Sequence, residues 1–288
     1  TECAGVEQKP EPEPEPVAEP DAEPETEKGN AGMLLLVLAV AVIGGLAALT
    51  GLFLLYRQLG TLSLDAMAAA AAGAEDRGLL WVGGLLVLVG FGAKAGAFPL
   101  HIWLPTAHPA APAPASAVLS GVITKTGIYG VLVLSTTVFL HDKQWGMLLA
   151  VLGAVTMVLG AVLAVLSVDL KRTLACSSIS QIGFILVGTA MLCLLGEHNA
   201  LAVDGTILHI LNHSLIKMVL FPAAGIIHLT THSFDLNDIR GFGRGKPLLA
   251  LVMGMPMLSL AGAPGLNGYV SKTLLHESIV EYIHLAGE

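Results

Sequence analysis

Charged residues are scarce in this 288-residue sequence, where they make up 12% of the chain against 54% hydrophobic residues. Together with a mean hydropathy of +0.75, this composition excludes an ordinary soluble domain and is typical of a polytopic membrane protein. The net charge of −8 arises at one end, because ten of the 22 acidic residues lie in the first 28 positions. The other 260 residues carry 12 acidic and 12 basic side chains and are neutral overall.

Cysteine is also scarce. Cys3, Cys176 and Cys193 match no disulfide or metal-binding spacing, so we expect reduced or buried thiols. The sequence has no Gly-rich dinucleotide motif, no Cys set for an iron–sulfur cluster and no activated Ser or Cys arrangement. We therefore expect no cofactor and no catalytic redox or hydrolytic site in this chain. Any redox chemistry would belong to partner proteins.

Residues 1–30 contain the run EPEPEPVAEPDAEPETE, which lacks the apolar side chains needed for a core. We expect this segment to be a disordered acidic Pro/Glu-rich tail that acts as a solvated linker, with docking to a partner as the alternative. The sequence has no signal peptide, starts at Thr1 and ends at Glu288 just after a motif. We therefore expect a fragment of a longer protein.

Residues 31–288 are expected to form one transmembrane domain. Their apolar runs are long enough to cross about 30 Å of hydrocarbon, which predicts an all-α, polytopic helix bundle with about seven spans. The spans cover roughly 32–56, 79–97, 115–139, 146–167, 174–195, 204–230 and 248–275. Two spans are expected to be discontinuous, as in transport sites, although simple proline kinks are the alternative. The candidate helix-breaking residues are Pro99, Pro105, Pro264 and Gly265.

Basic residues in the short loops predict the orientation of the bundle. The loops on the side of the N-terminal tail hold five Lys or Arg residues and the opposite loops hold three. Because cytoplasmic loops carry the excess of basic residues, this count favours a multi-pass protein of the cell inner membrane with its acidic segment in the cytoplasm.

Lysine is the ionisable residue found at membrane depth. Lys94, Lys125, Lys217 and Lys272 lie inside spans or at their breaks, whereas every acidic residue lies in the tail, a loop or a span end. A lysine inside a membrane costs several kcal/mol and usually has a function. An ammonium without a counter-ion is unstable there. Either these lysines exchange protons, or a matching carboxylate comes from another segment.

His209, His213 and Lys217 follow one another at four-residue intervals, which places them on one helical face. Imidazole can donate from one nitrogen and accept at the other, so this face predicts a proton relay. Helix-to-helix hydrogen bonding is the simpler alternative. Metal or haem binding by these histidines with His228 and His232 is less favoured, because no Cys or acidic ligand accompanies them at depth and Lys217 would repel a cation. We expect no metal.

Four segments carry a resemblance to a known family. In order they are GFGAKAGAFPLHIWLPTAHPAAPAPASAVLSGVITKTGIYG, DLKRTLACSSISQIGFILVG, HILNHSLIKMVLFPAAGIIH and GAPGLNGYVSK. They resemble the core motifs of the antiporter-like membrane subunits. That family comprises the proton-pumping subunits of respiratory complex I, Mrp-type sodium/proton antiporter subunits and membrane subunits of energy-converting hydrogenases. The resemblance covers about residues 32–280 and implies the sixth to twelfth of the family's fourteen helices, which include two inverted five-helix repeats.

The resemblance also implies roles for individual residues. Lys94 matches the lysine of the first broken helix, whose glutamate partner lies on the preceding fifth helix, and Lys125 matches the central lysine. His209 and His213 match the relay histidines, and Lys217 matches the lysine one turn further on. Lys272 matches the lysine of the second broken helix, a position that some members fill with glutamate. The acidic tail departs from the family pattern and is interpreted as an expanded loop.

These observations predict a proton-translocating subunit of a redox-driven or antiporter complex, with a relay of Lys94, Lys125, His209, His213, Lys217 and Lys272 near the bilayer midplane. Expected partners are other membrane subunits, the lipid bilayer and protons, and no nucleic acid. A translocase activity would belong to the assembled complex. One alternative is Mrp-type sodium/proton exchange, for which Thr124, Thr126 and Ser271 offer oxygen ligands. Another is a structural subunit that transports nothing.

Overall fold

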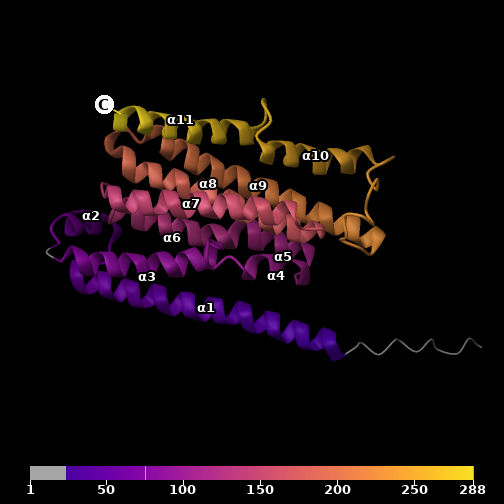
Figure 1. The fold of residues 1–288 in the computed structure, drawn as a ribbon, viewed down its shortest axis with the longest axis horizontal. Helices are drawn as coiled ribbons and strands as arrows, with labels where there is room; N and C mark the ends of the chain where they lie inside the picture. The colour runs from indigo at the N-terminus through magenta and orange to yellow at the C-terminus, as the bar shows by residue number, and fades with distance from the viewer. Residues whose placement is uncertain (1–23, 75, 288) are drawn as a thin grey trace, which may run out of the picture.

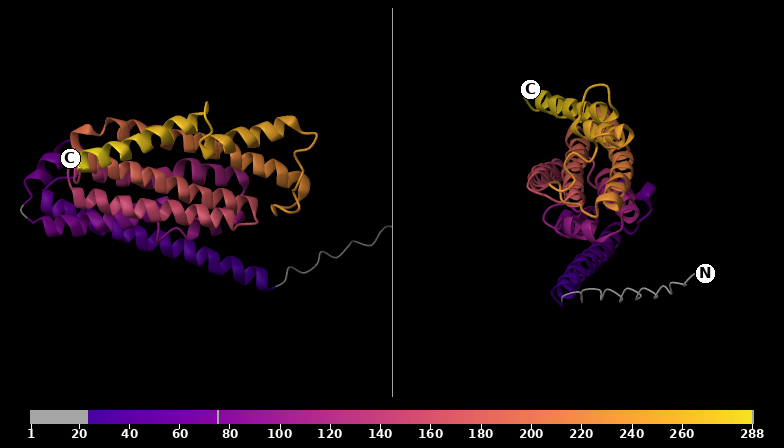
Figure 2. Two further views of the ribbon diagram at one scale, coloured as in Figure 1. Left: turned by 45° about the horizontal axis from the view of Figure 1, so that its top comes forward. Right: turned by 90° about the vertical axis from the view of Figure 1, so that its right-hand side faces the viewer.

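The fold is a bundle of long helices, and the prediction of an all-α membrane protein is confirmed (Figures 1 and 2). The computed structural model describes residues 24–74 and 76–287. In chain order the elements are α1 (Pro24–Leu59), α2 (Leu64–Ala72), α3 (Arg77–Ala95), α4 (Trp103–Ala110), α5 (Ala113–Val118), the π-helix η1 (Leu119–Ile123), α6 (Thr124–Thr137), α7 (Lys143–Val165), α8 (Leu170–Leu195), the 3-10 helix η2 (Gly196–His198), α9 (Ala200–Thr231), α10 (Pro247–Ala261) and α11 (Asn267–Gly287).

Six helical segments of the described chain are long and apolar enough to cross a membrane. They correspond to the first six predicted spans, and α5, η1 and α6 join into a segment of 25 residues. The seventh predicted span is divided between α10 and α11, as the Pro-Gly pair in it suggested. Helix α1 begins at Pro24, inside the stretch assigned to the acidic tail. The rest of that tail, residues 1–23, lies outside the described residues.

The helices alternate in direction between the ends of an elongated bundle (Figure 1). The start of α1, the α4–α5 junction and the links α7–α8 and α9–α10 lie at one end. Helix α2, the α6–α7 link, η2 and the C-terminus lie at the other. Helix α8 is the most enclosed span, with 83% of its apolar window buried, whereas α1 lies at the periphery with 6% buried. The site therefore forms around α8.

Glycines in the left-handed conformation end both discontinuous helices. Gly96 has a φ of 81° after α3 and Gly262 a φ of 89° after α10. Glycine adopts this conformation without steric cost and commonly caps helices in this way. Pro99 lies in the nonhelical segment after Gly96, and Pro264 and Gly265 lie in the turn after Gly262. Each break leaves helical carbonyl groups that need donors from elsewhere.

The structure corrects the assignment of Pro105 as a helix breaker. Pro105 lies in the first turn of α4, where proline is tolerated because the N–H groups of that turn have no helical partner. The long loop predicted between the first and second spans also contains helix α2. Its run of alanines has the highest helix propensity, and its Met67 is buried.

Small residues let neighbouring spans approach closely. A Cβ atom at Gly90 on α3 would clash with the Gly44 carbonyl and the Ala48 side chain on α1. A Cβ at Gly160 on α7 would likewise clash with the backbone of Ser180 on α8. Close backbone approach of this kind is a common way for membrane helices to associate. It fixes the spacing of the helices that carry the buried polar side chains.

Candidate functional site

Lys125 and His213 form the central contact of the site. The Lys125 Nζ lies 2.9 Å from the Nδ1 of His213, which joins α6 to α9. Both side chains are buried, and His213 is only 1% exposed. When Lys125 donates to Nδ1, the proton of the neutral ring is on Nε2. That Nε2 has no hydrogen-bond partner among the described residues. It is therefore free for an ordered water molecule or a transferred proton.

The π-helix η1 supplies the second partner of Lys125. The Lys125 Nζ donates to the Ser120 carbonyl at 2.6 Å, and the Thr124 hydroxyl donates to the same oxygen at 3.0 Å. The Ser120 hydroxyl is 2.7 Å from that of Ser178 on α8. Short π-helices disturb the regular backbone bonding and are frequent at functional sites. This one presents a carbonyl dipole to a buried amine.

His209 connects α8, α9 and α11. Its Nε2 lies 3.1 Å from the Gln181 Oε1 and its Nδ1 lies 3.0 Å from the Ser271 Oγ. All three side chains are buried. Lys272, the residue after Ser271, donates to the Leu260 carbonyl at 2.6 Å and lies 4.8 Å from the ring centre of Phe184. Lys272 thus satisfies one of the carbonyls at the end of α10.

Lys217 lies two turns beyond His209 on the same face of α9 and is fully buried. Its Nζ donates to the Leu174 carbonyl at 2.7 Å and to the Ser177 hydroxyl at 2.5 Å, both on α8. The three residues spaced at four-residue intervals therefore all face the interior of the bundle. Lys125, Lys217 and Lys272 use carbonyl, hydroxyl or imidazole groups as partners. In the described ranges, none of them forms an ion pair with a carboxylate.

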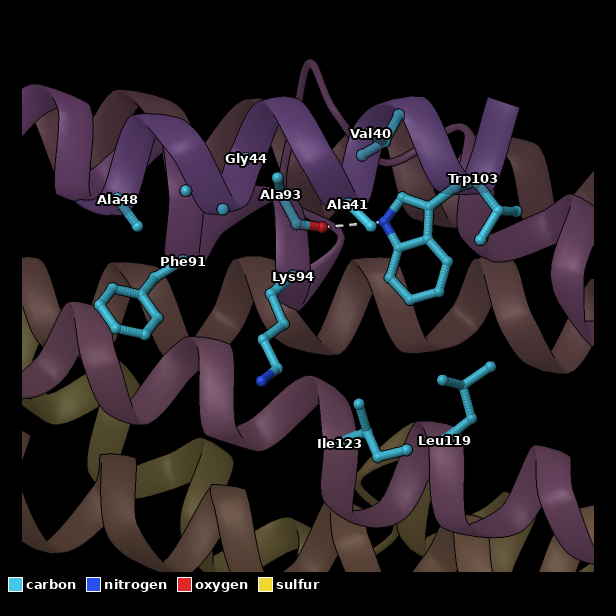
Figure 3. A pocket seen from close by; sticks show the side chains of 13 residues that line it. Val40, Ala41, Gly44, Ala48, Phe91, Ala93, Lys94, Trp103, Leu119 and Ile123 are labelled. Atoms are coloured by element: carbon cyan, nitrogen blue, oxygen red, sulfur yellow. Dashed lines mark hydrogen bonds between the residues drawn. The ribbon is translucent and has the colours of Figure 1, made fainter. Parts of the chain in front are cut away.

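Lys94 lies apart from this group. Its side chain is exposed and lines a cavity of about 500 Å³ between α1, α3 and η1, together with Gly44, Gly45, Trp103 and Ile123. Figure 3 shows the Lys94 side chain reaching from α3 towards the segment that carries Leu119 and Ile123. The Trp103 Nε1 donates to the Ala93 carbonyl at 2.8 Å and fixes α4 against the end of α3. Lys94 has no hydrogen bond to another described residue.

The histidines proposed as alternative ligands do not gather around one point. His228 stacks on Phe234 with ring centroids 4.0 Å apart, and His232 contacts it edge to face at 6.5 Å. His209 and His213 instead contact Gln181, Ser271 and Lys125. Among the described residues, no group of three or more His, Cys, Asp or Glu side chains is arranged to hold a metal ion.

Gln181 is a site residue that the sequence-based prediction missed, because that prediction considered ionisable residues only. A glutamine within the apolar stretch around SSISQIGF is itself a signal of a polar contact at membrane depth. Its partner His209 depends on how α8 packs on α9, which local sequence does not encode.

Two further buried side chains lie outside the predicted spans. Lys171 is only 4% exposed, donates to the Ala111 carbonyl at 2.6 Å and lies 4.4 Å from the ring centre of Phe234. His108 is fully buried and stacks on Phe221 with centroids 4.5 Å apart. Neither ring nitrogen of His108 has a hydrogen-bond partner within residues 24–74 and 76–287. These residues extend the buried polar groups towards the α4–α5 end.

Comparison with known proteins agrees with this architecture. The chain is 36% identical over 258 residues to hydrogenase-4 component B of Escherichia coli, an alignment that covers 87% of this chain and 38% of that protein. It is 34% identical over 237 residues to an Na(+)/H(+) antiporter subunit of Alkalihalophilus pseudofirmus, which covers 82% and 47% respectively. A chain in the structure of the Mrp complex from Dietzia sp. DQ12-45-1b matches with a TM-score of 0.80 and 28% identity, over 89% of this chain and 46% of that one.

The chain thus spans less than half the length of each of these relatives. The sequence profile described as NADH:quinone oxidoreductase/Mrp antiporter, TM, matches residues 22–287, which is most of the chain. The resemblance expected from the four motifs is therefore confirmed. This chain is an integral, multi-pass membrane protein that belongs to the NADH:quinone oxidoreductase/Mrp antiporter family.

Proposed function

We propose that this chain is part of an ion-translocating subunit of a multisubunit membrane complex, and that it conducts protons through its buried lysine and histidine side chains. Membership in the family supports the first statement. The contact between Lys125 and His213 is the single observation that carries the second. Each of these two groups can hold or release a proton, and they are hydrogen-bonded to each other in the interior of the bundle.

The absence of carboxylates among the described partners of the buried lysines supports a mobile proton. A buried ion pair would hold the charge firmly on lysine, because removing it leaves a buried carboxylate unpaired. Lys125 has instead a carbonyl and an imidazole as its described partners. The carbonyl of Ser120 stabilises the ammonium, and the imidazole offers an alternative position for its proton. The proton can therefore move over a hydrogen bond of 2.9 Å without separating an ion pair.

The proposed route runs from Lys125 to His213 and then along α9 to His209, Ser271 and Lys272. Ordered water would connect His213 to His209, because the Nε2 of His213 is buried without a described partner. Lys217 would act as a charge beside this route, held by its contacts with α8. Protons are thus expected to pass mainly within the plane of the membrane before they leave it.

Lys94 would exchange protons with Lys125 only when its charge is balanced from outside this chain. Its amine faces the cavity between α1, α3 and η1 and has no partner among the described residues. We propose that a carboxylate from another segment or subunit approaches it there. Such a carboxylate would hold the proton on Lys94, and its withdrawal would release the proton towards Lys125.

Sodium/proton exchange is the alternative within the family, and one observation argues against it here. The oxygens considered as sodium ligands do not converge, because Thr124 and Thr126 donate to separate carbonyls and Ser271 contacts His209 on another helix. Sodium requires several oxygen ligands around one point. We therefore propose protons as the translocated ion, and a cytoplasmic location in the inner membrane for the end of the bundle where α1 begins.

The test is ion transport by the full-length protein in its complex, measured with a pH-sensitive dye in inverted membrane vesicles. Lys272→Ala and Lys94→Ala should each lower proton transport by about tenfold or more and leave the complex assembled. Lys143→Ala, at an exposed lysine that begins α7, is the matched control and should transport normally. Undiminished transport by both site variants would refute the proposal. A rate that depends on sodium would favour the exchange reaction instead.

A further inference from the structure

The contacts around His209 restrict how that ring can carry a proton. Gln181 presents its carbonyl oxygen, Oε1, to Nε2. An amide oxygen only accepts hydrogen bonds, so Nε2 carries a hydrogen in both the neutral and the charged ring. Proton uptake and release are then left to Nδ1, which faces the Ser271 hydroxyl at 3.0 Å.

Ser271 has two acceptors within reach for its single hydrogen. Its Oγ lies 3.2 Å from the Gly268 carbonyl on α11 and 3.0 Å from Nδ1 of His209. When His209 is neutral, the hydroxyl can donate to Nδ1. When His209 is charged, Nδ1 is itself a donor, and the hydroxyl can turn to donate to Gly268 while it accepts from the ring. The rotation of one buried hydroxyl therefore satisfies both protonation states.

Ser271 is also adjacent in sequence to Lys272, whose Nζ donates to the Leu260 carbonyl. A hydroxyl between an imidazole and an amine can receive a proton on one side and give up its own on the other. The arrangement of an acceptor, an imidazole and a hydroxyl has the same logic as a catalytic triad, in which the acceptor fixes the tautomer. Here no bond other than O–H and N–H is made or broken.

We propose that His209 exchanges its proton only at Nδ1, through the hydroxyl of Ser271, and that Gln181 is the positioning residue that keeps the hydrogen on Nε2. The proposal rests on the proposed function, because it assigns a direction to a step in the same route. The proton passes from α9 to α11 at this point. A proton that leaves His209 moves to the Ser271 oxygen, which releases its own hydrogen towards Lys272, and the reverse step restores the ring.

Removing the hydroxyl is the first test, in the full-length complex in vesicles. Ser271→Ala should lower proton transport by about tenfold or more, because the ring loses its only described partner at Nδ1. Ser278→Ala is the matched control, since Ser278 is another buried serine of α11 and donates to the carbonyl three residues earlier, Leu275. It should transport normally. Equal transport by Ser271→Ala and the native protein, with normal assembly, would overturn the proposal.

Replacing the acceptor is the second test, and its readout is a pH profile that a purely structural role would not move. Gln181→Glu places a carboxylate against Nε2 and should stabilise the charged ring. The alkaline limit of transport should then move to higher pH by about one unit or more. The other charges near His209 are those of Lys272 on α11 and Lys125 on α6, with His213 on α9, and they are unchanged. A profile that does not move would contradict the role of Gln181.

Lys125→Ala in the same vesicles separates the exchange step from the proposed function. If it transports normally, the proposed function is wrong and the exchange step falls with it. If it abolishes transport while Ser271→Ala and Gln181→Glu behave as the native protein, the proposed function survives and only the exchange through Ser271 is refuted.

Discussion

The Lys125 Nζ and the His213 Nδ1 lie 2.9 Å apart in the interior of a membrane bundle, with a backbone carbonyl as the other partner of the lysine. A lysine in such surroundings is costly unless its charge is shared or transient. The carbonyl of Ser120 is available in this position because η1 departs from regular α-helical geometry. The local distortion of the backbone and the buried amine thus belong to one arrangement.

His213→Gln should separate hydrogen bonding from proton transfer at this contact. A glutamine oxygen could still accept from Lys125, but an amide does not carry a proton at neutral pH. Proton transport in vesicles should fall by about tenfold or more while the amount of assembled complex is unchanged. His232→Gln, at an exposed histidine beyond the end of α9, is the control. Full transport by His213→Gln would show that a hydrogen bond alone suffices there.

Gly45→Leu should test whether the cavity beside Lys94 receives a group from outside the chain. Gly45 lines this cavity, and a Cβ atom added to it would meet nothing within 4 Å. The substitution should therefore leave the described helices undisturbed but occupy the space in front of Lys94 and reduce transport or assembly. Gly254→Leu on α10 is matched, since its Cβ would also meet nothing within 4 Å. Equal behaviour of the two variants in transport and in pull-down of the complex would argue against an occupant.

Gly90→Leu should weaken the attachment of α1. A Cβ atom at Gly90 would overlap the backbone and Ala48 side chain of α1, so the two helices must move apart. Overpacking of this kind typically costs about 1–3 kcal/mol. The expected result is a lower midpoint of thermal unfolding in detergent, whereas Gly254→Leu should unfold at the native temperature. A Gly90→Leu protein as stable as the native one would mean that α1 is not held by this close contact.

The spans and their breaks could be predicted from sequence because they depend on local properties. Long apolar runs predict membrane helices, and Pro99 and Pro264 indicate where two of them are interrupted. The capping role of Gly96 and Gly262 was not predicted, because a glycine within an apolar run gives no sign of its φ. Helix α2 was missed because its alanine run lies between polar residues and is too short to span a membrane.

The common face of His209, His213 and Lys217 could be predicted in the same way, because helical geometry alone determines it. The partners of these residues could not, because they depend on tertiary packing. Gln181 meets His209 only because α8 packs against α9, and Lys171 is buried only because Phe234, more than sixty positions away in the sequence, covers it. The exposure of Lys94 has the same origin, since it depends on what lies beside α1 and α3.

The most direct measurement is the initial rate of proton transport in inverted vesicles that contain the full-length complex with Lys125→Ala. Lys143→Ala is measured beside it, and equal assembly is checked by native gel electrophoresis. Transport should fall by about tenfold or more with Lys125→Ala and stay unchanged with Lys143→Ala, because the first variant removes the amine that exchanges a proton with His213. Equal rates for the two variants would contradict a proton route through Lys125.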